Sequence, residues 1–143
     1  MKWTTRCLLS FVGVTIAISS QASAEIWSIH TRSNNIHCTL GDQPGKTEMW
    51  CVLFRISGPP ALPKPDDCSA TWGHGYFISD RGSVEMTCME KPTNDGWRGT
   101  SKFEKNKPTE LGGVTCTATR SKLSCMNLDG HGFSLSRRSQ SVF

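Results

Sequence analysis

Two histidines stand in nearly identical surroundings, and their side chains have the chemistry for a binding or reactive site. His74 lies in Gly73–Ser79 (GHGYFIS) and His131 lies in Gly130–Ser136 (GHGFSLS). Imidazole changes charge near neutral pH and acts as an acid, a base or a metal ligand, but a single histidine needs partners for catalysis. If the two bends lie side by side, the histidines would share a metal or bracket a polar ligand. The alternative is a half-buried, hydrogen-bonded histidine at each strand entrance.

Two further side chains are candidates for binding. Trp97 precedes Arg98 in a loop, where an exposed indole would stack on a sugar ring or anchor a protein partner. The alternative is an indole that folds back over a disulfide. Arg137 follows the last apolar alternation of the chain, where a solvated tail is the ordinary explanation. The candidate binding residues are therefore His74, His131, Trp97 and Arg137.

The motifs of the common enzyme classes are missing. The sequence has no Gly-x-Ser-x-Gly elbow, zincin helix, phosphate loop or dinucleotide fingerprint. Adjacent Asp66 and Asp67 point in different directions, whereas glycoside hydrolysis needs two opposed carboxylates. We therefore expect a non-catalytic binding module with no cofactor and no metal site. A small periplasmic hydrolase, or a hydrolase inhibitor, that uses the His131 region is the alternative.

The first 24 residues have the features of a secretory signal peptide. Lys2 and Arg6 precede an apolar run at 8–18, and Ala22-Ser23-Ala24 follows as a cleavage site. The run is shorter than the roughly 20 apolar residues that span a bilayer. We expect cleavage after Ala24, a periplasmic or secreted location, one domain over residues 25–143 and no transmembrane segment after cleavage.

The charge balance after Ala24 is nearly even. Of 16 Lys and Arg, two leave with the leader, and the remaining 14 face 12 Asp and Glu, a net charge of +2. So small an excess does not indicate nucleic acid or an anionic membrane. The expected partner is an envelope glycan or another exported protein, with no nucleic acid.

Six cysteines remain after Ala24, an even number in a compartment where disulfides are the default. Cys116 and Cys125 lie on the apolar sides of neighbouring strands, and a turn at 119–122 would place them opposite each other, within disulfide reach. For the others we take the nearest neighbours. The expected disulfides are Cys38–Cys51, across a turn at 41–45, Cys68–Cys88 and Cys116–Cys125.

Period-two alternation between Gly, Pro, Asn and Asp turns predicts an all-β fold, a disulfide-stapled antiparallel sandwich or barrel. The apolar run at 49–56 indicates a central strand covered on both faces. Alternation places Cys88 inward, and we assign Trp50 and Trp72 to the core. The proline-rich stretch at 58–67 is a stiff surface connection or a ligand for a partner domain. The stretch at 91–108 is expected to be an irregular surface loop, and it is the loop that an inhibitor would present.

Three groups of residues stand at characteristic spacings along the chain. They are Ser33–Cys38, Cys68–Gly73, and the closing series Gly113–Cys116, Leu123–Asn127 and Gly130–Arg137. Together they resemble an uncharacterised family of small secreted bacterial proteins known only as a domain of unknown function. The resemblance implies bacterial origin, export and disulfides, but no activity, ligand or catalytic residue. Asn34 replaces a usual glycine and tolerates a left-handed conformation, whereas the 116–125 hairpin lacks the family's glycine.

Overall fold

Two β-sheets make up the computed structural model, which describes residues 26–43, 46–95 and 101–143. The expected signal peptide and Trp97 lie outside these residues. The first sheet has the order β5-β4-β3-β2-β1-β6 and contains β1 (Ile26–His30), β2 (Ile36–Gln43), β3 (Lys46–Leu53), β4 (Thr71–Ser79), β5 (Glu85–Met89) and β6 (Ser101–Lys102). The second has the order β11-β10-β9-β8-β7 and contains β7 (Pro108–Leu111), β8 (Val114–Ala118), β9 (Lys122–Asn127), β10 (Gly132–Ser136) and β11 (Gln140–Val142).

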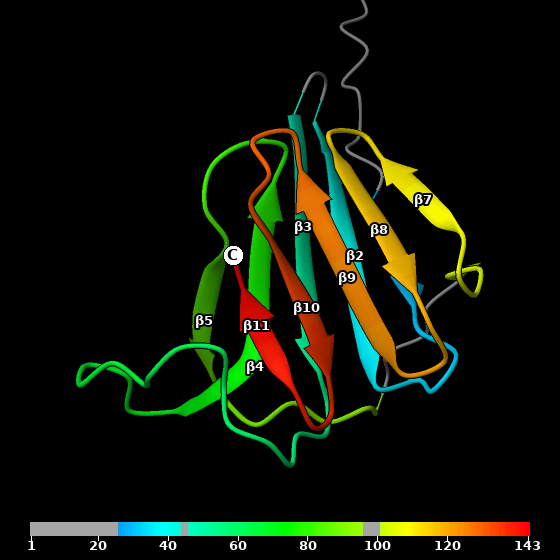
Figure 1. Ribbon diagram of the computed structural model, residues 1–143. Helices are drawn as coiled ribbons and strands as arrows, with labels where there is room; N and C mark the ends of the chain where they lie inside the picture. The colour runs from blue at the N-terminus through cyan, green and yellow to red at the C-terminus, as the bar shows by residue number, and fades with distance from the viewer. Residues whose placement is uncertain (1–25, 44–45, 96–100) are drawn as a thin grey trace, which may run out of the picture.

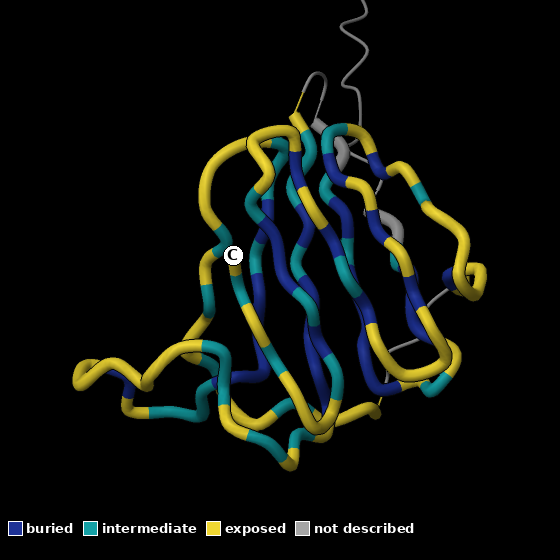
Figure 2. The backbone as a smooth tube through the Cα atoms, in the orientation of Figure 1, coloured by how far each residue is buried: buried dark blue, intermediate teal, exposed yellow. Residues whose placement is uncertain are grey.

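The sheets stack face to face as a sandwich (Figure 1). The prediction of an all-β fold is confirmed, and of the two architectures expected the chain adopts the sandwich. Neighbouring strands are antiparallel, apart from the parallel pair β1 and β6. Buried residues line the inner stretches of the strands, while many turn residues are exposed (Figure 2). Within the described ranges no helix occurs that is long and apolar enough to cross a membrane.

Alternation in β8 shows how the core forms. Val114, Cys116 and Ala118 are at most 1% exposed, whereas Thr115 and Thr117 between them face solvent. The β-branched threonines suit the outer surface of a pleated sheet. The predicted inward and outward positions of this strand are confirmed.

The three expected disulfides are present. Cys116 and Cys125 face each other across β8 and β9 with their Cα atoms 4.1 Å apart, and the hairpin closes as Thr119 N–H donates to the Lys122 carbonyl at 2.9 Å. Cys38 and Cys51 are likewise opposed, with a Cα separation of 4.0 Å. The expected turn at 41–45 is shorter, because the paired strands continue to Gln43 and Lys46. In the third disulfide, Cys68 and Cys88 have Cα atoms 5.6 Å apart.

Cys88 is exposed, so its predicted inward position is wrong. The β4–β5 register shifts between Thr71 and Gly75, next to Gly73 with its positive φ of 90°. β5 is also the edge strand of the first sheet, and it lies beside the second sheet rather than beneath it (Figure 1). Alternation along one strand could not show whether the side that Cys88 faces is covered by the rest of the fold.

The two tryptophans that we assigned to the core are only half-buried. Met49 and Cys51 point inward, so Trp50 between them lies on the outer face, where its Nε1–H donates to Thr87 Oγ1 at 3.2 Å. Trp72 Nε1–H donates to the Leu62 carbonyl at 2.9 Å. Each indole therefore forms a hydrogen bond at the surface, one to Thr87 of β5 and the other to Leu62 of the proline-rich connection.

The two long connections differ from each other. Residues 58–67 form neither helix nor strand, as predicted. In the 91–108 stretch, which we expected to be irregular, Ser101–Lys102 pairs with β1 and the next residue, Phe103, is 1% exposed. Phe103 N–H donates to the His30 carbonyl at 3.0 Å. The buried Phe103 side chain thus anchors the described part of this connection to the core.

Candidate functional site

Several turns that are distant in sequence meet at one end of the sandwich. The β1–β2, β8–β9 and β10–β11 turns lie together at the lower end in Figure 1, beside the segment that follows β3. Their contact is direct, since Ser33 N–H donates to the Arg120 carbonyl at 2.8 Å across the two sheets. In antiparallel strands alternate turns fall at the same end, so the topology concentrates the side chains of these turns.

Asn35 fixes the backbone of Arg55. Strand β3 ends at Leu53, short of the predicted Ile56, because Asn35 takes up the next backbone groups. Phe54 N–H donates to the Asn35 carbonyl at 3.0 Å, and Arg55 N–H donates to Asn35 Oδ1 at 2.9 Å. Asn35 Nδ2–H donates to the Arg55 carbonyl at 3.0 Å. A side chain that is 5% exposed therefore sets the position from which the Arg55 side chain emerges.

The same segment fixes Arg137 on the other sheet. Ser57 N–H donates to the Arg137 carbonyl at 2.8 Å, and Gly58 N–H donates to the same oxygen at 3.4 Å. A Cβ at residue 58 would overlap the carbonyl oxygen of Arg138. Glycine is needed here because the two backbones approach too closely for a side chain. Residues 54–58 thus hold Arg55 and Arg137 at a common end of the two sheets.

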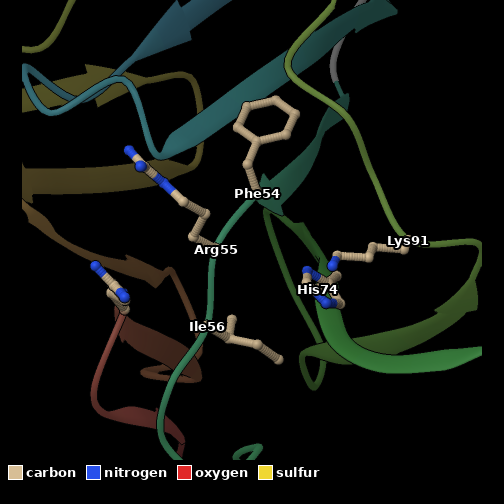
Figure 3. Close-up of a pocket in the computed structure, with 6 residues that line it drawn as sticks. Phe54, Arg55, Ile56, His74 and Lys91 are labelled. Carbon is tan, nitrogen blue, oxygen red and sulfur yellow. The ribbon is translucent and has the colours of Figure 1, made fainter.

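Phe54, Arg55, Ile56, His74, Lys91 and Arg137 line a hollow of about 380 Å³, called the His74 hollow below. Figure 3 shows His74 and Lys91 together on one side of the segment that carries Phe54 and Ile56, with the Arg55 guanidinium turned to the other side. His74 lies 2.6 Å, by Nδ1, from the Leu53 carbonyl oxygen. A carbonyl oxygen only accepts, so Nδ1 carries the proton and Nε2 is the other polar atom of the ring.

Two more hollows continue from this one. Ser33, Asn35, Arg55, Ser121 and Arg137 line the Ser33 hollow, of about 180 Å³. The next residues along the same two turns, Arg32 and Arg120, line the Arg32 hollow with Lys105, and its volume is about 380 Å³. None of the described residues that line the three hollows is Asp or Glu. We call their six cationic side chains the basic end: Arg32, Arg55, Lys91, Lys105, Arg120 and Arg137.

None of the described ion pairs includes a cation of the basic end. They are Lys46–Glu48 at 2.5 Å, Arg81–Asp129 at 2.7 Å and Lys107–Glu104 at 2.9 Å. Glu104, next to Lys105 in sequence, is thus engaged by Lys107. The six cations of the basic end are all exposed. Clustered cations without carboxylates create a positive potential that attracts anions.

His131 lies away from the basic end. It belongs to the β9–β10 turn, where its N–H donates to Asn127 Oδ1 at 3.1 Å. That turn packs on the β4–β5 turn, as Leu128 N–H donates to the Asp80 carbonyl at 3.0 Å. His131 lines none of the three hollows, so His74 and Arg137 are the two predicted residues that the fold brings together. The two glycine bends share a positive φ, 90° at Gly73 and 82° at Gly130, but Gly73 lies within β4 whereas Gly130 lies in the turn before β10.

Asp129 beside this turn is held in its charged form. The backbone N–H of Gly82 donates to Asp129 Oδ2 at 2.9 Å, and the Arg81 guanidinium donates to Oδ1 at 2.7 Å. First the Gly82 hydrogen bond and then Arg81 lower the pKa of Asp129. The carboxylate therefore ties two turns together at the far end of the sandwich.

Behind the basic end lies a pair of histidines that the sequence analysis did not single out. The rings of His30 and His37 stack with their centroids 5.0 Å apart, and both residues are at most 8% exposed. His37 Nε2 lies 2.8 Å from Asn34 Oδ1. Asn34 itself has a φ of 59°, the left-handed conformation expected of it. Burial, and next the neighbouring His30, lower the pKa of His37 to about 4.

Sequence reasoning named Arg137 but missed the other five cations of the basic end. The available signal was the position of these residues relative to the turns: Arg32 and Arg120 lie in hairpin turns, and Arg55 follows the end of a strand. Counting which turns fall at the same end of an antiparallel meander would have grouped them. In the described part of the chain, no three His, Cys, Asp or Glu side chains are placed to hold a metal ion.

Comparison with known proteins identifies the family of this chain. No match is found among curated proteins or among solved structures. A family model does match, described as a family of unknown function (DUF6636), and it covers residues 7–143. The three disulfides, typical of an oxidising extracellular compartment, agree with the resemblance seen in the sequence. The chain belongs to the DUF6636 family.

Proposed function

We propose that this protein is an exported, non-catalytic binding module of the cell envelope that holds anionic groups at its basic end. One observation carries the proposal: six exposed cations line three adjoining hollows, and no carboxylate is found among the lining residues that the structure describes. Bringing such charges together without a counter-charge costs stability. A bound anion would remove that cost.

The Ser33 hollow is the best candidate for direct contact. Arg55 comes from the first sheet and Arg137 from the second, and Asn35 and Ser57 fix their backbones. Guanidinium groups bind phosphate, sulfate and carboxylate through pairs of parallel hydrogen bonds. A hydroxyl at Ser121 adds a neutral donor. Lys91, which is exposed in the adjoining hollow, supplies a second point of contact.

An NMR titration with inorganic phosphate tests this function. We expect the amide signals of residues 33, 55, 121 and 137 to shift, and Arg55→Gln or Arg137→Gln to weaken binding about five- to tenfold. Arg81→Gln removes the same charge at the far end, where Arg81 is paired with Asp129, and should leave the phosphate affinity unchanged. Shifts that avoid these four residues, or equal loss in all three variants, would contradict the proposal.

Export is a separate part of the proposal. The signal-peptide pattern of residues 1–24 and the oxidised cysteines support cleavage after Ala24 and a periplasmic or secreted location. Mass spectrometry of protein purified from its native host should find Glu25 as the first residue and no free thiol. A retained leader would refute it. The alternative of a hydrolase or hydrolase inhibitor around His131 stays an untested prediction.

A further inference from the structure

We infer that the ligand of the basic end is a polymer, an anionic glycan chain that spans the three hollows, rather than one small anion. The inference rests on the proposed function and concerns the same site. Its basis is the order of the hollows. The His74 and Ser33 hollows share Arg55 and Arg137, and the Ser33 and Arg32 hollows are lined by successive residues of two turns.

The order of the hollows produces a track of cations. Lys91 lies at one end, Arg55 and Arg137 lie in the middle, and the third group consists of Arg32, Lys105 and Arg120. The Ser33–Arg120 hydrogen bond joins the middle to the third group. In Figure 3 the Arg55 guanidinium points away from Lys91, although both residues line the His74 hollow, so the two charges face different directions. A single phosphate cannot contact all of these groups, whereas charges repeated along a chain can.

The surroundings favour a glycan over a nucleic acid or a bilayer. Proteins that bind single-stranded nucleic acid stack bases on aromatic side chains, but the described aromatic rings that line these hollows, Phe54 and His74, are only 6% and 5% exposed. Surface binding to a bilayer uses exposed apolar side chains beside the cations. The described large apolar residues that are most exposed, Met126, Leu128 and Phe143, line none of the hollows. Polar hydroxyls and cations in shallow hollows suit a hydrophilic chain.

The discriminating experiment compares short and long fractions of phosphorylated dextran at equal phosphate concentration, with neutral dextran as a blank. A chain that reaches two groups gains from effective concentration, so the long fraction should bind at least about tenfold tighter per phosphate. Lys105→Gln/Arg120→Gln should abolish most of that gain. It should leave the shifts that inorganic phosphate causes at residues 55 and 137 unchanged.

A matched double variant controls for net charge. Lys46→Gln/Arg81→Gln also removes one lysine and one arginine, but these two are paired with Glu48 and Asp129, outside the basic end. Its affinity for the long fraction should stay within about twofold of the affinity of the unmodified protein, because exposed ion pairs contribute little.

The Lys105→Gln/Arg120→Gln variant should also reduce the slope of log affinity against log salt concentration by about 1 to 2, because two cations no longer neutralise phosphates of the bound chain.

Three results would overturn the inference. Equal affinity per phosphate for both fractions would mean that the hollows act as separate small-anion sites, and the proposed function would survive. Tighter binding of an oligothymidylate, or of phosphatidylglycerol vesicles, than of the long dextran at equal phosphate would replace the glycan by another polymer or a surface. Absence of binding to phosphate and to every polymer would refute the proposed function itself.

Discussion

Asn35 and Arg55 are joined by reciprocal hydrogen bonds, one from the Arg55 N–H to Asn35 Oδ1 at 2.9 Å and one from Asn35 Nδ2 to the Arg55 carbonyl at 3.0 Å. These hydrogen bonds end β3 and place Arg55 at the Ser33 hollow. Asn35 is therefore a positioning residue, and its role can be separated from a purely structural one.

Asn35→Ala should weaken phosphate binding about fivefold while costing about 1 to 3 kcal/mol of unfolding free energy, because it leaves the partly buried N–H and carbonyl of Arg55 without their Asn35 side-chain partners. The matched control is Asn127→Ala. Asn127 is also 5% exposed and bonds the Ser79 and Gly82 carbonyls at the far end. Denaturant unfolding should show a similar loss for both, with reduced phosphate affinity only for Asn35→Ala. Equal affinities would contradict the positioning role.

Gly58→Ala should destabilise the protein by about 1 to 3 kcal/mol and displace the β10–β11 turn, since the added Cβ would overlap the Arg138 carbonyl. The displaced turn carries Arg137, so phosphate binding should fall as well. Gly41→Ala serves as the control, because nothing lies within 4 Å of a Cβ at that position. Thermal unfolding and the phosphate titration measure both effects, and an unchanged amide signal for Arg137 would refute the prediction.

Acidification should destabilise the protein through His37. Its folded pKa of about 4 lies below the ordinary 6.5, so between these values the unfolded chain binds the proton and the folded chain does not. The contribution of neutral His37 to the unfolding free energy is complete above pH 6.5. About 2 to 3 kcal/mol of it is lost as the pH falls towards 4.

The unfolding free energy of His37→Gln should vary less between pH 6.5 and 4 than that of the unmodified protein. Carboxylates that titrate in the same range affect both proteins equally, so the difference between the two curves isolates the effect of His37. NMR titration of the His37 ring gives the pKa directly. A midpoint near 6.5 would contradict the prediction.

Mild reduction should open the Cys68–Cys88 disulfide first. Cys88 is exposed, whereas the four other paired cysteines are at most 1% exposed and shielded from an attacking thiolate. Brief treatment with dithiothreitol, alkylation and peptide mapping should label Cys68 and Cys88 before the rest. Since neither residue lines the hollows, the singly reduced protein should keep its phosphate affinity. Early labelling of Cys116 or Cys125 would contradict the prediction.

Local sequence patterns predicted the pairings because strand alternation is a local property. Cys116 and Cys125 are separated by one turn, and their register follows from counting residues to its centre. The exposure of Cys88 did not follow, because it depends on a register shift near Gly73 and on which strand of the second sheet lies above β5. Neither property is encoded within five or six neighbouring residues.

The basic end was not predicted for a related reason. The net charge of +2 after Ala24 is an average over the chain and conceals its distribution. Arg32, Arg55 and Arg137 come together only when both sheets have formed and stacked. His131, selected by its glycine context, proved to lie at a turn beside Asp80, whereas its counterpart His74 joins the cations.

Each disulfide of the described chain joins partners on the same layer: Cys38–Cys51 links β2 to β3, Cys68–Cys88 links the approach to β4 with β5, and Cys116–Cys125 links β8 to β9. The disulfides therefore prevent one strand from shifting in register along its neighbour. A shift of one residue would turn the inward side chains of that strand towards solvent. Cohesion between the layers is left to apolar packing and to backbone bridges such as Ser57 to Arg137. Under mechanical load the layers would part before the stapled strands lost their pairing.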